Sequence, residues 1–149
     1  MGLLQKLFGI GRQSLAETEQ SIERSSVLAR VNDIRYIGYG VRDLEAEKRF
    51  YTESWMLEEV PSNDGMVYLV APGTRASYSV RLRQTDAPRI DVISWSAKDR
   101  AEVDALVPQI EAAGGKIITQ PSNLSSKGGG YGFRFFDTNG FTIEVSTEF

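Results

Sequence analysis

The chain has 149 residues, of which 41% are hydrophobic and 25% charged, and its formal net charge is −3. This is the composition of an ordinary globular domain, and nothing in it forms the basic face that nucleic acid requires. The absence of both cysteine and histidine excludes disulfides, thiolate metal sites and His-dependent catalytic triads.

Residues 1–30 form the first predicted segment. Its apolar residues have helical spacing, at Leu3, Leu4, Leu7, Phe8 and Ile10. Residues 11–30 are polar and rich in serine, which favours disorder. We therefore expect a helical or partly disordered leader that docks on the following domain or on a partner subunit, with a helix lying on a membrane surface as the alternative. No apolar run approaches the roughly 20 residues of a membrane span, so we expect a cytoplasmic protein without a membrane partner.

A first module is predicted at about 33–86. Asp33–Val41 alternates and is rich in Ile, Tyr and Val, which is typical of a strand. Asp43 is a good N-cap for the helix that follows. Three short strands are then expected at about 57–61, 66–71 and 76–84, because Gly- and Pro-containing turns separate them.

The same order of elements recurs at about 88–147. A strand at Arg89–Ser96 precedes a helix that Asp99 caps and that runs through Ala113, with a kink expected at Pro108. Strands follow near 116–120, 131–136 and 141–146. We therefore predict an α+β domain at 31–149, built from two tandem βαβββ modules whose mixed sheet curls into a cup or half-barrel with the helices outside.

Two segments resemble a known superfamily. IRYIGYGVRDLEAEKRFYTESWMLEEV (34–60) resembles the first module of the vicinal oxygen chelate superfamily, which includes glyoxalase I, bleomycin-resistance proteins and type I extradiol dioxygenases. GGGYGFRFFDTNGFTIEVS (128–146) is similar to its closing hairpin, especially the version in the extradiol ring-cleavage enzymes.

The resemblance implies a metal inside the cup, held by two His and one Glu around Fe(II) or Mn(II) in the extradiol enzymes. These ligand positions fall on Tyr36, near Asp91 and on Glu144. The phenol of Tyr36 is neutral at pH 7 and is a poor ligand for Fe(II), and two carboxylates alone would make a weak site. We therefore expect no metal or other cofactor in this chain and treat Tyr36, Asp91 and Glu144 as vestigial positions.

Strand alternation predicts which side chains enter the cup: Tyr36, Arg81, Asp91, Trp95, Arg134 and Glu144. One interpretation is a polar cavity in which the arginines bind an acidic or phenolic ligand and Trp95 stacks on it. The other is that an arginine pairs with Asp91 or Glu144 and fills the cup as a structural network, since buried charges must be paired.

The resemblance implies three functional hypotheses. The first is the non-catalytic, iron-free half of an extradiol dioxygenase of aromatic catabolism, with a catalytic dioxygenase domain or subunit as its partner. The second is a binding protein of the glyoxalase/bleomycin-resistance type for an aromatic or acidic small molecule. The third is an enzyme that uses a hard metal or no metal. A homo-oligomer is expected in each case.

Overall fold

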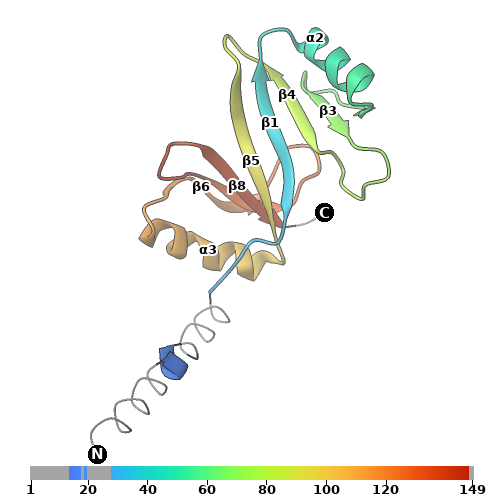
Figure 1. The fold of residues 1–149 in the computed structure, drawn as a ribbon. Helices are drawn as coiled ribbons and strands as arrows, with labels where there is room; N and C mark the ends of the chain where they lie inside the picture. Colours follow the sequence, from blue (N-terminus) through green and yellow to red (C-terminus); the bar gives the residue numbers. More distant parts are fainter. Residues whose placement is uncertain (1–13, 18, 20–27, 148–149) are drawn as a thin grey trace, which may run out of the picture.

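The computed structural model describes residues 14–17, 19 and 28–147. The predictions for the leader at 1–30 lie largely outside these residues. Within the described part, no helix is long and apolar enough to cross a membrane. The elements are β1 (Ile34–Val41), α2 (Leu44–Arg49), the π-helical turn η1 (Phe50–Ser54), β2 (Glu58–Val60), β3 (Val67–Val70), β4 (Val80–Gln84), β5 (Arg89–Ala97), α3 (Arg100–Ala112), β6 (Lys116–Asn123), β7 (Tyr131–Phe136) and β8 (Thr142–Thr147) (Figure 1).

All eight strands join in one mixed sheet with the order β2-β3-β4-β1-β5-β8-β7-β6. β1 pairs parallel with β4, and β5 pairs parallel with β8. The two halves meet where β1 and β5 run antiparallel. Strand, helix and three strands thus occur twice, and each half has the same internal order. The predicted α+β class with a mixed sheet is confirmed.

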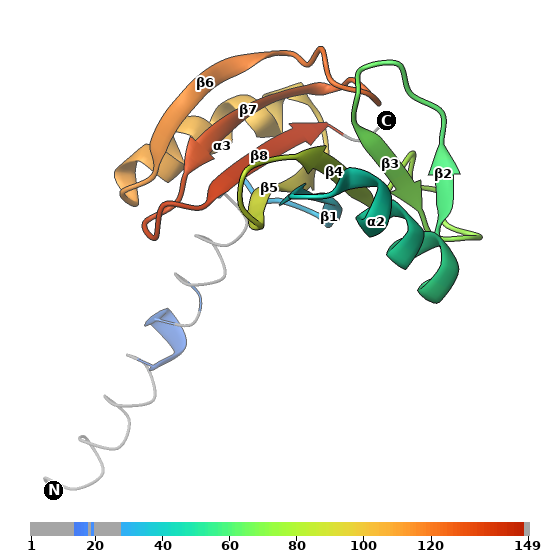
Figure 2. The same ribbon diagram turned by 90° about the horizontal axis from the view of Figure 1, so that it is seen from above.

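The predicted cup is not found. The sheet is not closed and not strongly curled, and Figure 2 shows β2 and β6 at its opposite ends. A closed barrel would require β2 and β6 to form hydrogen bonds with each other. Each of them is instead an edge strand with a single paired neighbour. Most residues of β6 are exposed, as expected for an edge strand with one neighbour.

Both helices lie on the same face of the sheet. Asp43 caps α2 by accepting a hydrogen bond from the Ala46 amide at 3.0 Å, and Asp99 caps α3 by accepting one from Glu102 at 2.9 Å. Under α2 the core contains Val41, Val67, Leu69 and Leu82. At α3 the core is formed by Val103 and Leu106 of the helix together with Ala97, Phe133 and Val145 of the sheet. The opposite face therefore has to accommodate the polar residues that alternate with this core.

Candidate functional site

The face of the sheet opposite the helices, here called the network face, carries a row of four polar side chains. Glu144 on β8 is paired with Ser94 on β5 and with Arg134 on β7, and Ser94 is paired in turn with Tyr36 on β1. Since directly paired residues point to the same side of a sheet, the register alone brings these four side chains together. Glu144 is 0% exposed and lies within this row.

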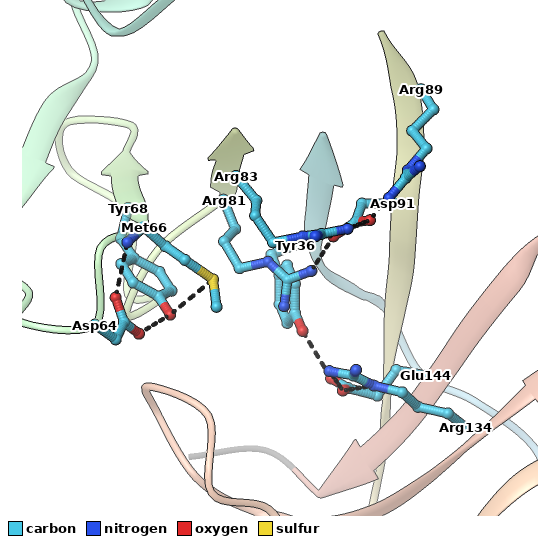
Figure 3. A network of polar contacts seen from close by, with 10 residues as sticks. All are labelled: Tyr36, Asp64, Met66, Tyr68, Arg81, Arg83, Arg89, Asp91, Arg134 and Glu144. Carbon is cyan, nitrogen blue, oxygen red and sulfur yellow. Dashed lines mark hydrogen bonds and ion pairs between the residues drawn. The ribbon is translucent and has the colours of Figure 1, made fainter. Parts of the chain in front are cut away.

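Both carboxylate oxygens of Glu144 are engaged. Its Oε1 accepts hydrogen bonds from the Tyr36 hydroxyl at 3.0 Å and from the Ser94 hydroxyl at 2.8 Å. Its Oε2 accepts a hydrogen bond from Nε of Arg134 at 2.8 Å and forms an ion pair with Nη2 of the same side chain, also at 2.8 Å (Figure 3). A buried carboxylate is tolerated only with such a charged partner and with hydrogen bonds to its remaining lone pairs.

The protonation states of Tyr36 and Arg134 follow from their positions beside Glu144. Burial of the ring, and then the negative charge of Glu144, raises the pKa of Tyr36 far above its usual value. Tyr36 is therefore a neutral hydrogen-bond donor at physiological pH. Burial by itself lowers the pKa of Arg134, but the charge and the hydrogen bond of Glu144, together with Tyr36, outweigh it, so the resulting pKa is raised. Arg134 stays cationic.

Aromatic rings fill the space beside this row. The Tyr36 ring lies 4.7 Å from that of Tyr78, which lies 4.7 Å from that of Tyr68. The Tyr78 hydroxyl donates to the carbonyl of Lys127 at 3.0 Å, which ties the Gly-rich loop of the second module to the first. Tyr36, Tyr68 and Tyr78 are each 1% exposed. These three rings therefore fill the part of the network face beside Glu144 with closely packed side chains.

A second polar cluster surrounds Asp91. Its Oδ2 accepts hydrogen bonds from Arg81 Nη2 and Arg83 Nε, each at 2.9 Å, and Arg83 Nη2 pairs with Oδ1 (Figure 3). Arg89 lies 3.5 Å from Oδ1. The hydrogen bond from Arg83 lowers the pKa of Asp91 despite partial burial, so the carboxylate stays charged.

Gly38 on β1 leaves room for the Arg81 side chain. A Cβ at this position would lie 2.8 Å from Cγ1 of Val92 and 3.0 Å from Arg81 Nη2. Arg81 also lies over the Tyr36 ring, 5.6 Å from its centroid, at a distance typical of a cation–π contact. Glycine at position 38 of β1 therefore leaves the space that the Arg81 side chain occupies.

Five of the six predicted site residues lie on the network face. Tyr36, Arg134 and Glu144 meet in one cluster, while Arg81 and Asp91 meet in the other. These pairs are the ones that the network interpretation requires. The prediction that Asp91 joins Tyr36 and Glu144 is wrong, because Asp91 binds arginines and Ser94 takes the place beside Glu144.

The prediction that Trp95 faces the same side is also wrong. Trp95 packs against the core beneath α3. The cause is a register shift: Gly38 is paired with Val92 and Tyr39 with Ile90, which leaves Asp91 unpaired. Such a bulge reverses the alternation of the strand. Val92 and Ser94 therefore point to the network face, and Trp95 to the helices.

The residues at this site do not fit the metal that the resemblance implies. In the part of the chain that the structure describes, no three Asp or Glu side chains come together as a possible ion site. Every oxygen of Glu144 already accepts hydrogen bonds, and the Arg134 guanidinium lies against Oε2. A divalent ion would have to displace this cation and then bind a phenol and a serine hydroxyl, which are poor ligands for Mn(II) or Fe(II).

A hollow of about 560 Å³ lies beside the N-terminal part of β1. Tyr36 and Arg35 contribute to its lining, but Asp91, Arg134 and Glu144 do not. Arg35 is buried there and donates to Ser146. The hollow therefore gives no access to the Glu144 carboxylate.

Three comparisons place these observations among known proteins. The sequence profile of the glyoxalase/bleomycin resistance protein/dioxygenase superfamily matches residues 33–145. The Mn(II)-bound glyoxalase from Novosphingobium aromaticivorans is 47% identical, with a TM-score of 0.78, over 81% of this chain and 40% of that one. The manganese-dependent 2,3-dihydroxybiphenyl 1,2-dioxygenase of Geobacillus genomosp. 3 is 26% identical over 118 residues, which are 78% of this chain and 37% of that protein.

The fold also matches the homoprotocatechuate 2,3-dioxygenase from Arthrobacter globiformis. Its TM-score is 0.72 at 24% identity, over 81% of this chain and 37% of that one. The chain thus spans well under half the length of each of these relatives, and the match to this last enzyme concerns the fold alone.

Proposed function

Since the chain belongs to the glyoxalase/bleomycin resistance protein/dioxygenase superfamily, we propose that it is a non-catalytic, metal-free domain of extradiol dioxygenase type. In this proposal its partner is a catalytic domain or subunit of the same superfamily, and the pair acts on an aromatic substrate. The chain contributes a rigid sheet and an interface, while the partner holds the metal.

The observation that carries the proposal is the engaged carboxylate of Glu144. The resemblance to the superfamily implies a metal ligand at this position, but here Oε1 and Oε2 accept from Tyr36, Ser94 and Arg134. The guanidinium supplies the positive charge next to the carboxylate that a metal would otherwise supply. Without open coordination positions no substrate oxygen or O₂ can be activated at this site.

The greater length of the relatives supports the proposal that this chain acts together with a second domain or subunit. The manganese-dependent dioxygenase and the Mn(II)-bound glyoxalase each extend well beyond the part that this chain matches, since it covers 37% and 40% of them. Their additional sequence is long enough for a second copy of this fold. We propose that an equivalent copy completes the present protein, either in the same polypeptide or as a separate subunit.

The proposal is tested by oxygen uptake with catechol in the presence of Fe(II) or Mn(II). The chain alone is expected to consume no oxygen and to form no ring-cleavage product. Co-expression with the product of an adjoining superfamily gene that carries two His and a Glu is expected to give a stable complex that cleaves the ring. Cleavage by the chain alone would contradict the proposal, as would a partner whose activity and association are unaffected by this chain.

A second candidate is a binding protein of the glyoxalase/bleomycin-resistance type. The observation that favours it is the surplus of arginine around Asp91, where three guanidinium groups share one carboxylate. Two of these guanidinium groups, those of Arg83 and Arg89, reach solvent and are available to the carboxylate of an acidic small molecule.

A further inference from the structure

The cluster around Asp91 has an unbalanced charge. Arg81, Arg83 and Arg89 bring three positive charges to a single carboxylate, so the cluster has a surplus of two. The chain as a whole has a net charge of −3, so the surplus is local. The neighbouring pair of Arg134 and Glu144 is balanced and does not compensate it.

Asp91 accepts three hydrogen bonds from these arginines, two from Arg83 and one from Arg81. Its Oδ2 already accepts from both Arg81 and Arg83, and its Oδ1 pairs with Arg83. The Nε of Arg81 is buried and has no hydrogen-bond partner among the described residues. Arg81 itself is only 5% exposed. A buried guanidinium donor without an acceptor is costly, so the charge of Arg81 is only partly compensated within the protein.

The cluster opens outward from this buried residue. Side-chain exposure is 6% for Arg81 and 11% for Asp91, but 38% for Arg83 and 55% for Arg89. The inner charges are therefore recessed behind two arginines that reach solvent. The guanidinium groups of Arg83 and Arg89 are thus the ones that an anion in solution can contact.

We propose that Arg83 and Arg89, supported by the buried Arg81, bind the carboxylate of a small organic acid. Guanidinium groups suit this ligand because their planar donors match the two carboxylate oxygens, often in pairs of parallel hydrogen bonds. Asp91 positions Arg83 through two hydrogen bonds. The second carboxylate would bring the cluster closer to neutrality. This inference rests on the binding function given above as the second candidate and adds the ligand class and the residues.

The test uses benzoate as the probe and benzamide as its neutral control, at matched ionic strength. NMR signals of the arginine Nε–H groups are followed during each titration. Benzoate is expected to shift the signals of Arg83 and Arg89, while benzamide leaves them in place. Arg83→Gln and Arg89→Gln are each expected to weaken benzoate binding about tenfold, since each removes a charge-assisted contact. Both side chains are partly exposed, so neither substitution threatens the fold.

Arg49→Gln is the matched control, because it removes the same charge from an exposed position on α2. It is expected to bind benzoate like the unmodified protein. Equal binding of benzoate by all three variants, or shifts located elsewhere in the protein, would overturn the assignment to this cluster while leaving a binding function in place. Equal binding of benzamide, or no binding of benzoate, would overturn the carboxylate specificity and with it this candidate function.

Discussion

Arg134 and Glu144 face each other across β7 and β8, with Nε and Nη2 of the arginine each 2.8 Å from Oε2 of the fully buried carboxylate. This relationship decides the chemistry of the network face, because it places a fixed cation beside the carboxylate that the resemblance implies as a metal ligand.

Removal of the cation is expected to destabilise the domain. Arg134→Met leaves Glu144 buried without its charged partner, which costs about 3 kcal/mol of unfolding free energy. The double variant Arg134→Met/Glu144→Gln is expected to recover part of this loss, because it removes the uncompensated charge. Denaturant unfolding measures both, with Arg49→Gln as the control for a lost surface charge. A single variant as stable as the control would contradict the described pairing.

Alkaline stability should depend on Tyr36. Burial and the Glu144 charge raise the pKa of Tyr36 in the folded state, whereas the unfolded phenol titrates near 10. The stability from the protonated phenol is therefore fully present below about pH 10 and is lost as the pH rises from there towards the folded pKa. Tyr36→Phe should show a shallower decline in this range than the unmodified protein, measured by urea unfolding at several pH values. Parallel curves for the two proteins would argue against a buried phenol at this position.

Tyr36→Phe also tests the hydrogen bond to Glu144 at neutral pH. The substitution keeps the ring that packs on Tyr78 and removes one of the two hydroxyl donors to Oε1. We expect a loss of about 1–3 kcal/mol, because the acceptor is a buried charged group. Ser94→Ala, which removes the other donor, should cost a similar amount. No effect of either change would mean that Oε1 finds its donors elsewhere.

Gly38→Ala should disturb the Asp91 cluster. The added methyl group would lie 2.8 Å from Val92 and 3.0 Å from Arg81, so one of these side chains has to move. Overpacking of this kind costs about 1–3 kcal/mol. The Nε–H signal of Arg81 is expected to shift as well, whereas that of Arg134 in the separate cluster should change little. An unchanged Arg81 signal at unchanged stability would contradict the close approach.

The identity of the second vestigial position can be tested by building a metal site. Tyr36→His and Ser94→His place two imidazoles beside Glu144, and Arg134→Met removes the competing cation. This triple variant is expected to bind Mn(II), detected by electron paramagnetic resonance. The matched variant with Asp91→His in place of Ser94→His should bind far more weakly, because Asp91 does not contact Glu144. If both triple variants bound Mn(II) equally, Asp91 would remain a match for the second metal-ligand position that the resemblance implies.

Much of the fold could be predicted from the sequence because its signals are local. Asp43 and Asp99 cap the two helices as expected, and the turn at 137–140 places Arg134 opposite Glu144. The bulge at Asp91 could not be predicted, since it depends on how β1 and β5 pair across 50 or so residues of sequence. That single shift moved Trp95 away from the network face and brought Ser94 onto it. The curvature of the sheet likewise depends on pairing between strands, which the alternation within one strand does not determine.

The most direct test of the central claim is a titration of the unmodified chain with Mn(II), compared with Glu144→Gln. If Arg134, Tyr36 and Ser94 engage the carboxylate, both proteins will show the same weak, non-saturating association by equilibrium dialysis. Tight and saturable binding to the unmodified chain that disappears in Glu144→Gln would contradict the account.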